Sequence, residues 1–387
     1  MFPRSFLVRR PARIHRVVAT SLFLVLGFHV GVWAVQLAGL SAALHLDPGP
    51  LGTALTVASA CGIVTLFAGG RLADRLGRRP VLLLGFGGTS VAFALLSQVH
   101  HVGGLFAVLA LYGLFVSFID LGANSVGADL EHQHQVRAMT GLHSGFSFGA
   151  MAGALLSSVV LWSGAGFRAV YLGLAVLLAT AALAAALVPL PEPAPEEPTE
   201  RPTGVWRIPA VLFAIALVTV TFFGDGALES FLAVYLQRIL GSGTLLTGLG
   251  VAAYHCASLI GRLLARRALQ RWGERYVVSA AGIVAASGLV VAVTANHVIV
   301  AIAGLLLVGF AIAPVVPSAL SLAARSAPGR SGRAVAITTA AGYSSFIVSP
   351  VLVGWVADAT TLRTGLAVLI VTALGIAVLG ARWPTRE

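Results

Sequence analysis

Long apolar runs alternate with short polar turns along almost the whole chain. A helix needs about 20 apolar residues to cross the hydrocarbon core of a bilayer, so the runs predict twelve membrane-spanning helices. Six are predicted in the first half, at about 17–44, 52–70, 80–99, 103–126, 139–162 and 167–189. Six more are predicted in the second half, at about 208–236, 245–264, 276–295, 298–324, 334–357 and 362–383. This pattern is that of an all-α integral membrane protein.

One polar segment divides the series into two equal halves. Proline and glutamate dominate the segment from Pro189 to Pro202, and such a composition does not form a packed element. We therefore expect a solvated cytoplasmic linker at residues 190–207. It joins an N-terminal six-helix bundle, residues 1–189, to a C-terminal six-helix bundle, residues 208–387.

The composition excludes an ordinary soluble protein. Of the 387 residues, 58% are hydrophobic and 10% are charged, whereas about 25% of the residues of a soluble domain are charged. The mean hydropathy is +0.93. Cys61 and Cys256 both lie inside apolar runs and show no metal-ligand spacing, so we expect neither a disulfide nor a metal site.

The distribution of positive charge predicts the orientation in the membrane. The net charge of +11 comes from arginine alone, since the chain has no lysine. The arginines gather in short loops, which is typical of the positive-inside bias and not of nucleic-acid binding. With the N-terminus inside, 22 of the 25 arginines are cytoplasmic, and three fall outside: Arg168, Arg238 and Arg363. Both termini are then cytoplasmic, and the basic N-terminus leads into an uncleaved first span.

A charged turn between the second and third runs has a counterpart in the second half. Residues 69–80 contain four arginines and one aspartate, as expected for a cytoplasmic hairpin. The segment around Gly77 is echoed around Gly273, 196 residues later. Two six-helix halves in parallel repeat suit a transporter that rocks about a site near the midplane.

The residues from Gly70 to Arg79 resemble the signature loop between the second and third helices of the major facilitator superfamily. Other stretches are similar to a bacterial inner-membrane branch of that family with largely unassigned substrates: Asp120–Asn124, Leu142–Gly149, Tyr235–Gln237, Gly261–Leu263 and Gly354–Asp358. The resemblance implies two six-helix bundles around a central cavity, which the first, fourth, seventh and tenth helices line. It does not imply a particular substrate.

The same resemblance implies a conformational gate in the signature loop. Its expected members are Gly70, Asp74, Arg75, Gly77, Arg78 and Arg79. Asp74 is expected near the start of the eleventh helix, at residues 331–335, where the helix dipole favours a carboxylate. Gly77 allows a tight turn, and the arginines face anionic headgroups or the acidic residues Asp129 and Glu131. The alternative is that the arginines only set the orientation. Gln270 replaces Asp74 in the second half, so any charge latch is one-sided.

Polar groups inside the apolar runs are the candidates for function, because a central Asp costs about 2.5–3.5 kcal/mol on insertion scales. Two pairs are spaced i, i+4 and so share a helix face, and a third group forms a stripe on the first span. We predict that these residues bind the solute or couple a proton: His29, Trp33, Gln36, Asp120, Asn124, Asp225 and Glu229.

Each candidate also has a purely structural interpretation. Asp225 and Glu229 lie near the outer half of their span, where an external vestibule could hydrate them. Asp120 could be a buried acid that is hydrogen-bonded to a neighbouring helix. For His143 an interhelical hydrogen bond is favoured, and for His255 a place in the core. His29 is the histidine that we expect at the cavity.

A glycine repeat on the fifth span predicts close helix packing. Gly141, Gly145, Gly149 and Gly153 recur every four residues, with His143 among them, and such a stripe lets another backbone approach. The neighbour is either a helix of the second bundle, as the resemblance suggests, or a helix of the same bundle. On the tenth and eleventh spans, prolines predict kinks: Pro314, Pro317 and Pro350.

These features favour a secondary active transporter that moves a small organic solute by alternating access and is coupled to protons. A sugar or another polar metabolite is the favoured cargo, and efflux of drugs or amphipathic compounds by an antiporter is the alternative. An alternative from another class is a receptor or scaffold with the same fold and no transport activity. Neither a catalytic constellation nor a phosphate-binding loop is found, which argues against an enzyme and against an ATP-driven pump.

The expected partners are the solute, protons and the lipid bilayer, without cofactor or nucleic acid, in a monomer of the bacterial inner (plasma) membrane. The sequence leaves open the substrate, import versus export, the choice among symport, antiport and uniport, the proton-carrying carboxylate and the oligomeric state.

Overall fold

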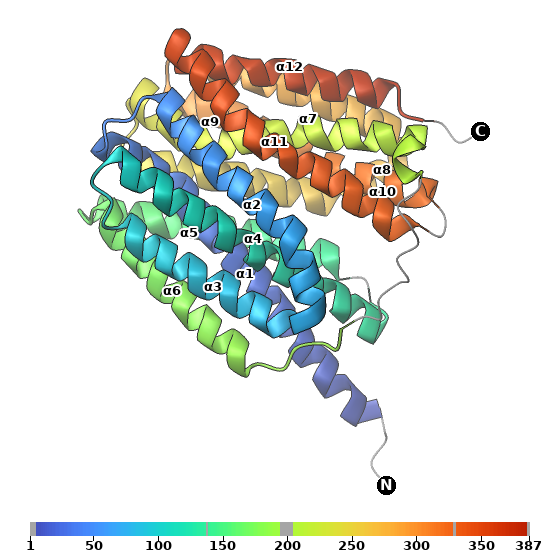
Figure 1. Cartoon of the computed structure of the whole chain (residues 1–387). Helices are drawn as coiled ribbons and strands as arrows, with labels where there is room; N and C mark the ends of the chain where they lie inside the picture. The colour runs from blue at the N-terminus through green and yellow to red at the C-terminus, as the bar shows by residue number, and fades with distance from the viewer. Residues whose placement is uncertain (1–4, 137, 194–203, 328–329, 385–387) are drawn as a thin grey trace. The chain divides into compact units, whose positions relative to one another are not determined.

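The structure is a computed structural model that describes residues 5–136, 138–193, 204–327 and 330–384, without the side chains of residues 5–11, 66–76 and 332. Every regular element in these ranges is a helix (Figure 1). The first half comprises α1 (Ser5–Ala43), α2 (Pro48–Leu76), α3 (Arg78–Leu96), α4 (Val102–His134), α5 (Met139–Trp162) and α6 (Phe167–Leu187). The second half comprises η1 (Val205–Arg207), α7 (Pro209–Val234), the π-helical turn η2 (Tyr235–Ile239), α8 (Thr244–Thr294), α9 (Val298–Ile312), α10 (Val315–Ser326), α11 (Ser331–Ala359) and α12 (Leu362–Ala381).

Among the described residues, ten segments are long and apolar enough to cross a membrane. With α8 divided at Gly273, where the backbone leaves helical geometry, and with α2 added, the helices correspond one to one to the predicted spans. The tenth span is broken at Pro314 into α9 and α10, which confirms the predicted kink. Pro350 lies inside α11, which continues through it.

The chain forms two compact units. Unit 1 consists of Met1–Trp33 and Val57–Pro198, and unit 2 consists of Ala34–Thr56 and Thr199–Glu387. The main boundary falls within residues 190–207, the segment predicted as the linker, of which residues 194–203 lie outside the described part. The last ten residues of α1 and the first turns of α2 group with unit 2, an exchange that the apolar pattern does not indicate.

In unit 1, α3 packs along α4 and α6 (Figure 1), while glycines bring α5 against α1. A Cβ atom at Gly149 or Gly153 of α5 would collide with the backbone of α1, and one at Gly27 or Gly31 of α1 would collide with the backbone of α5. Such reciprocal small-residue contacts let two membrane helices approach closely. Gly149 and Gly153 therefore pack against a helix of the same bundle, which is one of the two predicted neighbours, and a neighbour in the second bundle stays a prediction.

The other members of the repeat pack less tightly. Gly145 faces Thr20 of α1, and Gly141 has open space where a side chain would stand. The exposed ring of His143 lies edge-on to Phe23 of α1, with ring centroids 5.1 Å apart. The close packing of α5 is thus confined to the half of the helix that contains Gly149 and Gly153.

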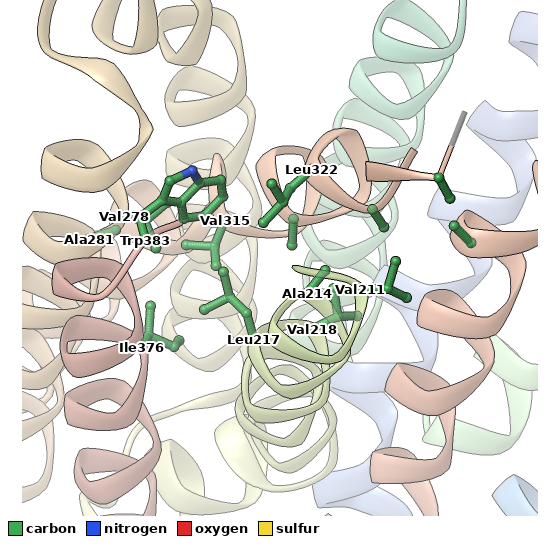
Figure 2. Packing of buried hydrophobic residues seen from close by; sticks show 14 of the residues in the cluster. Val211, Ala214, Leu217, Val218, Val278, Ala281, Val315, Leu322, Ile376 and Trp383 are labelled. Atoms are coloured by element: carbon green, nitrogen blue, oxygen red, sulfur yellow. The ribbon is translucent and has the colours of Figure 1, made fainter. Parts of the chain in front are cut away.

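In unit 2, α8 packs against α9 and α12, and α7 packs against α11. A buried apolar cluster lies between several helices of this unit (Figure 2). Its members come from η1, α7, α8, α10, α11, α12 and the residues just after α10 and α12, and they include Val211, Leu217, Val278, Val315, Ile376 and Trp383. In hydrocarbon, van der Waals packing of this kind drives helix association, because lipid tails are as apolar as the side chains.

The internal repeat is visible in the backbone and in the ion pairs. Gly77 has φ 80° and ψ 176°, and Gly273, 196 residues later, has φ 78° and ψ 162°. In unit 1, Arg78 pairs with Asp129 at 2.8 Å. In unit 2, the residues with the same offset of 196 form an equivalent pair with reversed charges, Glu274 and Arg325, also at 2.8 Å.

The opposite ends of the helices repeat as well. Arg168, at the start of α6, donates hydrogen bonds to the carbonyl groups of Ser97 (3.1 Å) and Val99 (3.2 Å), just beyond the end of α3. Arg363, at the start of α12, donates to the carbonyl groups of Val293 (2.7 Å) and Ala295 (2.6 Å). These two residues follow Ser97 and Val99 by 196 positions each. These cations satisfy carbonyl groups at a helix C-terminus, where positive charge is favourable.

Candidate functional site

Two carboxylates of α7 and two side chains of α8 form a polar cluster within unit 2. Asp225 and Glu229 lie one turn apart on α7, and both are partly buried. The hydroxyl group of Tyr254, on α8, donates a hydrogen bond of 2.9 Å to Asp225 Oδ1. Arg262, two turns further along α8, interacts electrostatically with both acids. The cluster thus combines two carboxyl groups, a phenol and a guanidinium inside membrane-spanning helices.

The apolar pattern placed Arg262 with the cytoplasmic arginines because the eighth run ends close to it. In the structure α8 continues in helical geometry as far as Gly273, about three turns beyond Arg262. The sequence signal for a place of Arg262 in the cluster is its spacing, since Arg262 stands two turns after Tyr254 on the same helix. His255 is buried, with its ring 5.4 Å from that of Tyr254, and its surroundings support the core interpretation.

The α1 candidates lie in the interior of the protein in this conformation. His29 is fully buried in unit 1, with Nδ1 2.7 Å from the carbonyl oxygen of Leu26 and Nε2 3.1 Å from the hydroxyl group of Tyr112. The Trp33 ring stacks on Tyr112 at 4.9 Å and meets Phe93 edge-on. Part of the predicted stripe is therefore the centre of an aromatic cluster, and a direct role of His29 and Trp33 in solute binding stays a prediction.

The remaining predicted pairs keep the geometry that their spacing indicates. The side-chain amide of Asn124 donates to Asp120 Oδ1 at 3.0 Å and to the Asp120 carbonyl at 2.9 Å, and both residues are partly buried. Gln36 is fully buried, in the segment of α1 that groups with unit 2. Their roles in binding also stay predictions.

The internal repeat relates the α1 candidates to the α7 candidates. His29 and Asp225 are 196 residues apart, and so are Trp33 and Glu229. This is the same offset that relates the two turn glycines and the two ion pairs. The residues predicted from their polarity therefore occupy equivalent positions on the first helix of each half.

The two expected gate arginines whose side chains the structure describes, Arg78 and Arg79, make hydrogen bonds within unit 1. Arg78 pairs with Asp129, as one of the two alternatives predicted. Arg79 instead donates to carbonyl groups at the end of α6, those of Ala185, Ala186 and Val188.

The described hydrogen bonds of Glu131, the second acidic residue expected near these arginines, are with the start of α5. Its carboxylate accepts hydrogen bonds from the amides of Ala138 and Met139 at the start of α5, where a helix N-terminus favours negative charge. Gly77 has the positive φ that its predicted tight turn requires. Gly70, Asp74 and Arg75 lie in the last turns of α2, outside the part whose side chains are described, so their gating role stays a prediction.

The helical fold, the repeated halves and the intramembrane polar cluster define a polytopic membrane transporter. The family model of the Major Facilitator Superfamily matches residues 18–254 and 214–387, and the chain belongs to this family. It is a multi-pass membrane transporter and not an enzyme.

The chain is similar to bacterial transporters over almost its whole length. An uncharacterized MFS-type transporter of Yersinia pestis is 27% identical over 374 residues, which are 96% of this chain and 97% of that protein. An uncharacterized transporter of Sinorhizobium fredii is 25% identical over 358 residues, 92% of this chain and 95% of that protein.

Solved structures show the same fold at low identity. The nucleoside transporter NupG has a TM-score of 0.75 at 13% identity, over 95% of this chain and 98% of that one. A bacterial homolog of the human lysosomal transporter Spinster, inward-facing and occupied, has a TM-score of 0.75 at 14% identity, over 95% of both chains.

Proposed function

We propose that this transporter moves a small organic solute by alternating access and that Asp225 and Glu229 couple the movement to protons. The observation that carries the proposal is the cluster of these two acids with Tyr254 and Arg262 inside membrane-spanning helices. Charged side chains at membrane depth are costly and typically mark solute or proton pathways. The charges of the cluster do not balance, since two carboxylates face one guanidinium.

A single proton would remove this imbalance. With one of the two acids protonated, the carboxylate and the guanidinium of Arg262 cancel. When that proton leaves, the cluster carries one net negative charge, which a cationic group of a solute or a new proton can neutralise. Binding of solute and release of a proton are then linked through the same two side chains.

The equivalent positions on α1 supply the complementary chemistry. An imidazole and an indole at His29 and Trp33 stand where α7 carries its acids. One amide lies nearby in sequence at Gln36, and another lies on α4 at Asn124. Amides fix hydroxyl or carboxylate groups, and an indole offers a flat apolar face to a sugar ring or a cationic group. These groups favour a sugar or another polar metabolite as the solute.

A second candidate is the efflux of amphipathic compounds. Phe222, one turn before Asp225 on α7, lies 5.5 Å from the ring of Tyr343 and 5.7 Å from the ring of Phe346 on α11. An aromatic group beside two acids suits a cationic amphipathic ligand. This candidate predicts that hydrophobic cations stabilise the protein and that sugars do not.

A thermal-shift screen identifies the ligand class. Purified protein is heated with sugars, carboxylates, nucleosides and hydrophobic cations, since a ligand that binds the folded state raises its apparent stability by about 2.7 kcal/mol at one hundred times Kd. Nucleosides are included because a nucleoside transporter has the same fold.

Proteoliposomes then test the coupling with the compound that stabilises most. We expect Asp225→Asn and Glu229→Gln each to lower accumulation driven by a pH gradient by at least about tenfold, with equilibrium exchange of the solute less affected. Glu192→Gln is the control, because it removes an exposed carboxylate at the end of unit 1. Full accumulation in both α7 variants would exclude proton coupling through this cluster.

A further inference from the structure

The start of α2 has one backbone donor that its own helix does not use. α2 begins at Pro48, and Pro48 and Pro50 have no N–H group. The amide of Leu51 already bonds to the carbonyl of Asp47, at 3.1 Å. Of the first three residues of the helix, only Gly49 therefore offers a donor, at the end where the helix dipole is positive.

That donor is taken by a carboxylate at the far end of the sequence. Asp358, in the last turn of α11, accepts a hydrogen bond of 2.9 Å from the amide of Gly49 through Oδ1. Both residues belong to unit 2, because residues 34–56 group with the second half of the chain. A carboxylate at a helix N-terminus is favourable both as a hydrogen-bond acceptor and as a charge.

Glycines bring the two helices close enough for this contact. A Cβ atom at Gly354 of α11 would collide with the carbonyl of Pro48, and one at Gly52 of α2 would collide with the carbonyl of Pro350. The indole of Trp355 donates to Thr53 Oγ1 at 3.3 Å, and Thr56 donates to the carbonyl of Ile347 at 2.7 Å. The first turns of α2 thus rest backbone-to-backbone on α11.

A second contact holds the α1–α2 turn from the other side. Arg238, in the π-helical turn η2, donates a hydrogen bond of 2.7 Å to the carbonyl of Leu46 and also interacts electrostatically with Asp47. π-helical turns are rare in proteins, and those that occur often lie at functional sites. The turn between α1 and α2 is therefore held from both α11 and the end of α7.

We propose that the carboxylate of Asp358 and the N-terminus of α2 form a releasable latch, which must open when the transporter exposes its solute site on the side of the α1–α2 turn. The inference rests on the alternating access proposed above. Release breaks the hydrogen bond of Asp358, which water can replace because Asp358 is exposed. The arginine distribution predicts that this side is the outer one.

The sequence around Asp358 supports a dedicated role. The pattern Gly-x-x-Ala-Asp occurs twice in the chain, at Gly354–Asp358 near the end of α11 and at Gly70–Asp74 near the end of α2. In the described copy, the glycine allows the close approach and the aspartate, one turn later, reaches the helix end. Both parts of the pattern have a physical use in the latch.

A cysteine pair tests whether the latch closes in the membrane. Cys61→Ala and Cys256→Ala provide the background, and Gly49→Cys with Asp358→Cys introduces the pair. A Cβ atom at position 49 would contact the Asp358 carboxyl group, so a disulfide fits this geometry. We expect rapid cross-linking of this pair in membranes, and slow cross-linking of the control pair Gly49→Cys with Ala359→Cys. Equal rates for the two pairs would overturn the proposal.

Distances between spin labels test whether Asp358 controls the closure. With labels at the exposed positions Ala42→Cys on α1 and Ile299→Cys on α9, we expect Asp358→Ala to raise the ratio of long to short distances about 2- to 30-fold, the range for loss of a helix cap. Thr360→Ala, which removes a hydroxyl bonded to its own helix, should match the wild type. An unchanged distribution in Asp358→Ala would also overturn the latch.

Neither measurement needs a solute or a proton gradient. These measurements can therefore contradict the latch while the transport assays support proton coupling through Asp225 and Glu229. They can equally support the latch while the transport assays contradict the coupling.

Discussion

Arg78 donates two hydrogen bonds to the carboxylate of Asp129, at 2.8 Å from Nε and 3.2 Å from the terminal nitrogen, and so joins α3 to α4. Arg325 donates two to Glu274 at the equivalent place in the second half, at 2.8 and 3.0 Å. Two-pronged pairs of this kind add geometric specificity to charge. Each half uses the same connection between the same helices, and only the polarity is exchanged.

The two pairs should differ in their contribution to stability. The Asp129 side chain is 1% exposed and Arg78 is 16% exposed, whereas Glu274 and Arg325 are 29% and 38% exposed. Asp129→Ala removes a fully buried carboxylate that a partly buried guanidinium bonds to, and we expect a loss of about 3–5 kcal/mol. Glu274→Ala should cost less than about 1 kcal/mol. Unfolding of the purified protein in detergent, followed by circular dichroism, measures both.

An exchange of charges provides the control for this prediction. Arg78→Glu with Asp129→Arg copies the second-half pair into the first half, and it should recover at least half of the loss that either single change causes. A double variant no more stable than the worse single variant would show that the α3–α4 connection depends on more than charge.

The two turn glycines should resist substitution. Gly77 and Gly273 combine φ values of 80° and 78° with ψ values of 176° and 162°, a region that essentially only glycine adopts and in which a side chain costs about 1–3 kcal/mol. We expect Gly77→Ala and Gly273→Ala each to lower the free energy of unfolding by this amount. Gly87→Ala is the matched control, because Gly87 lies in helix α3 with open space around it, and alanine there should stabilise by about 0.5–1 kcal/mol. A stabilising effect at position 77 would contradict the backbone geometry.

The glycine repeat of α5 should respond unevenly to alanine. A methyl group at Gly149 would strike the backbone of α1, while one at Gly141 would meet open space. We expect Gly149→Ala to destabilise unit 1 by about 1–3 kcal/mol through overpacking, and Gly141→Ala to be neutral or stabilising. The melting temperature in detergent separates the two, and similar values would show that α1 and α5 do not pack closely.

The orientation can be measured by cysteine labelling in intact cells. Ser163→Cys places an exposed thiol at the C-terminal end of α5, and His132→Cys places one at the C-terminal end of α4. The predicted topology puts these two positions on opposite sides of the membrane. Both variants are made in the background without Cys61 and Cys256. Because the arginine bias predicts that the α5–α6 turn is outside, an impermeant maleimide should label position 163 at once and position 132 only after permeabilisation. The opposite pattern would invert the predicted topology.

Much of the fold follows from local sequence. Apolar runs of membrane length locate the spans, and a glycine after a charged helix end locates the turns at Gly77 and Gly273. The i, i+4 spacing of Asp120 with Asn124 survives because a regular helix determines it alone.

The parts that could not be predicted depend on residues distant in sequence. His29 was expected at a cavity, but its surroundings are decided by Tyr112, 83 residues away, and hydropathy does not report such a contact. Arg262 was counted with the cytoplasmic arginines because its run of apolar residues ends while its helix continues. The contact of Asp358 with Gly49 spans 309 residues, and no periodicity connects the two.

The reversed polarity of the ion pairs restricts how such a chain can be recombined. If α3 alone were replaced by its second-half counterpart, a glutamate would face Asp129, and the two carboxylates would repel each other. If α4 alone were replaced, Arg78 would face an arginine. Single helices are therefore not interchangeable between the halves, and the smallest segment that can be exchanged intact is the pair of helices that a connection joins.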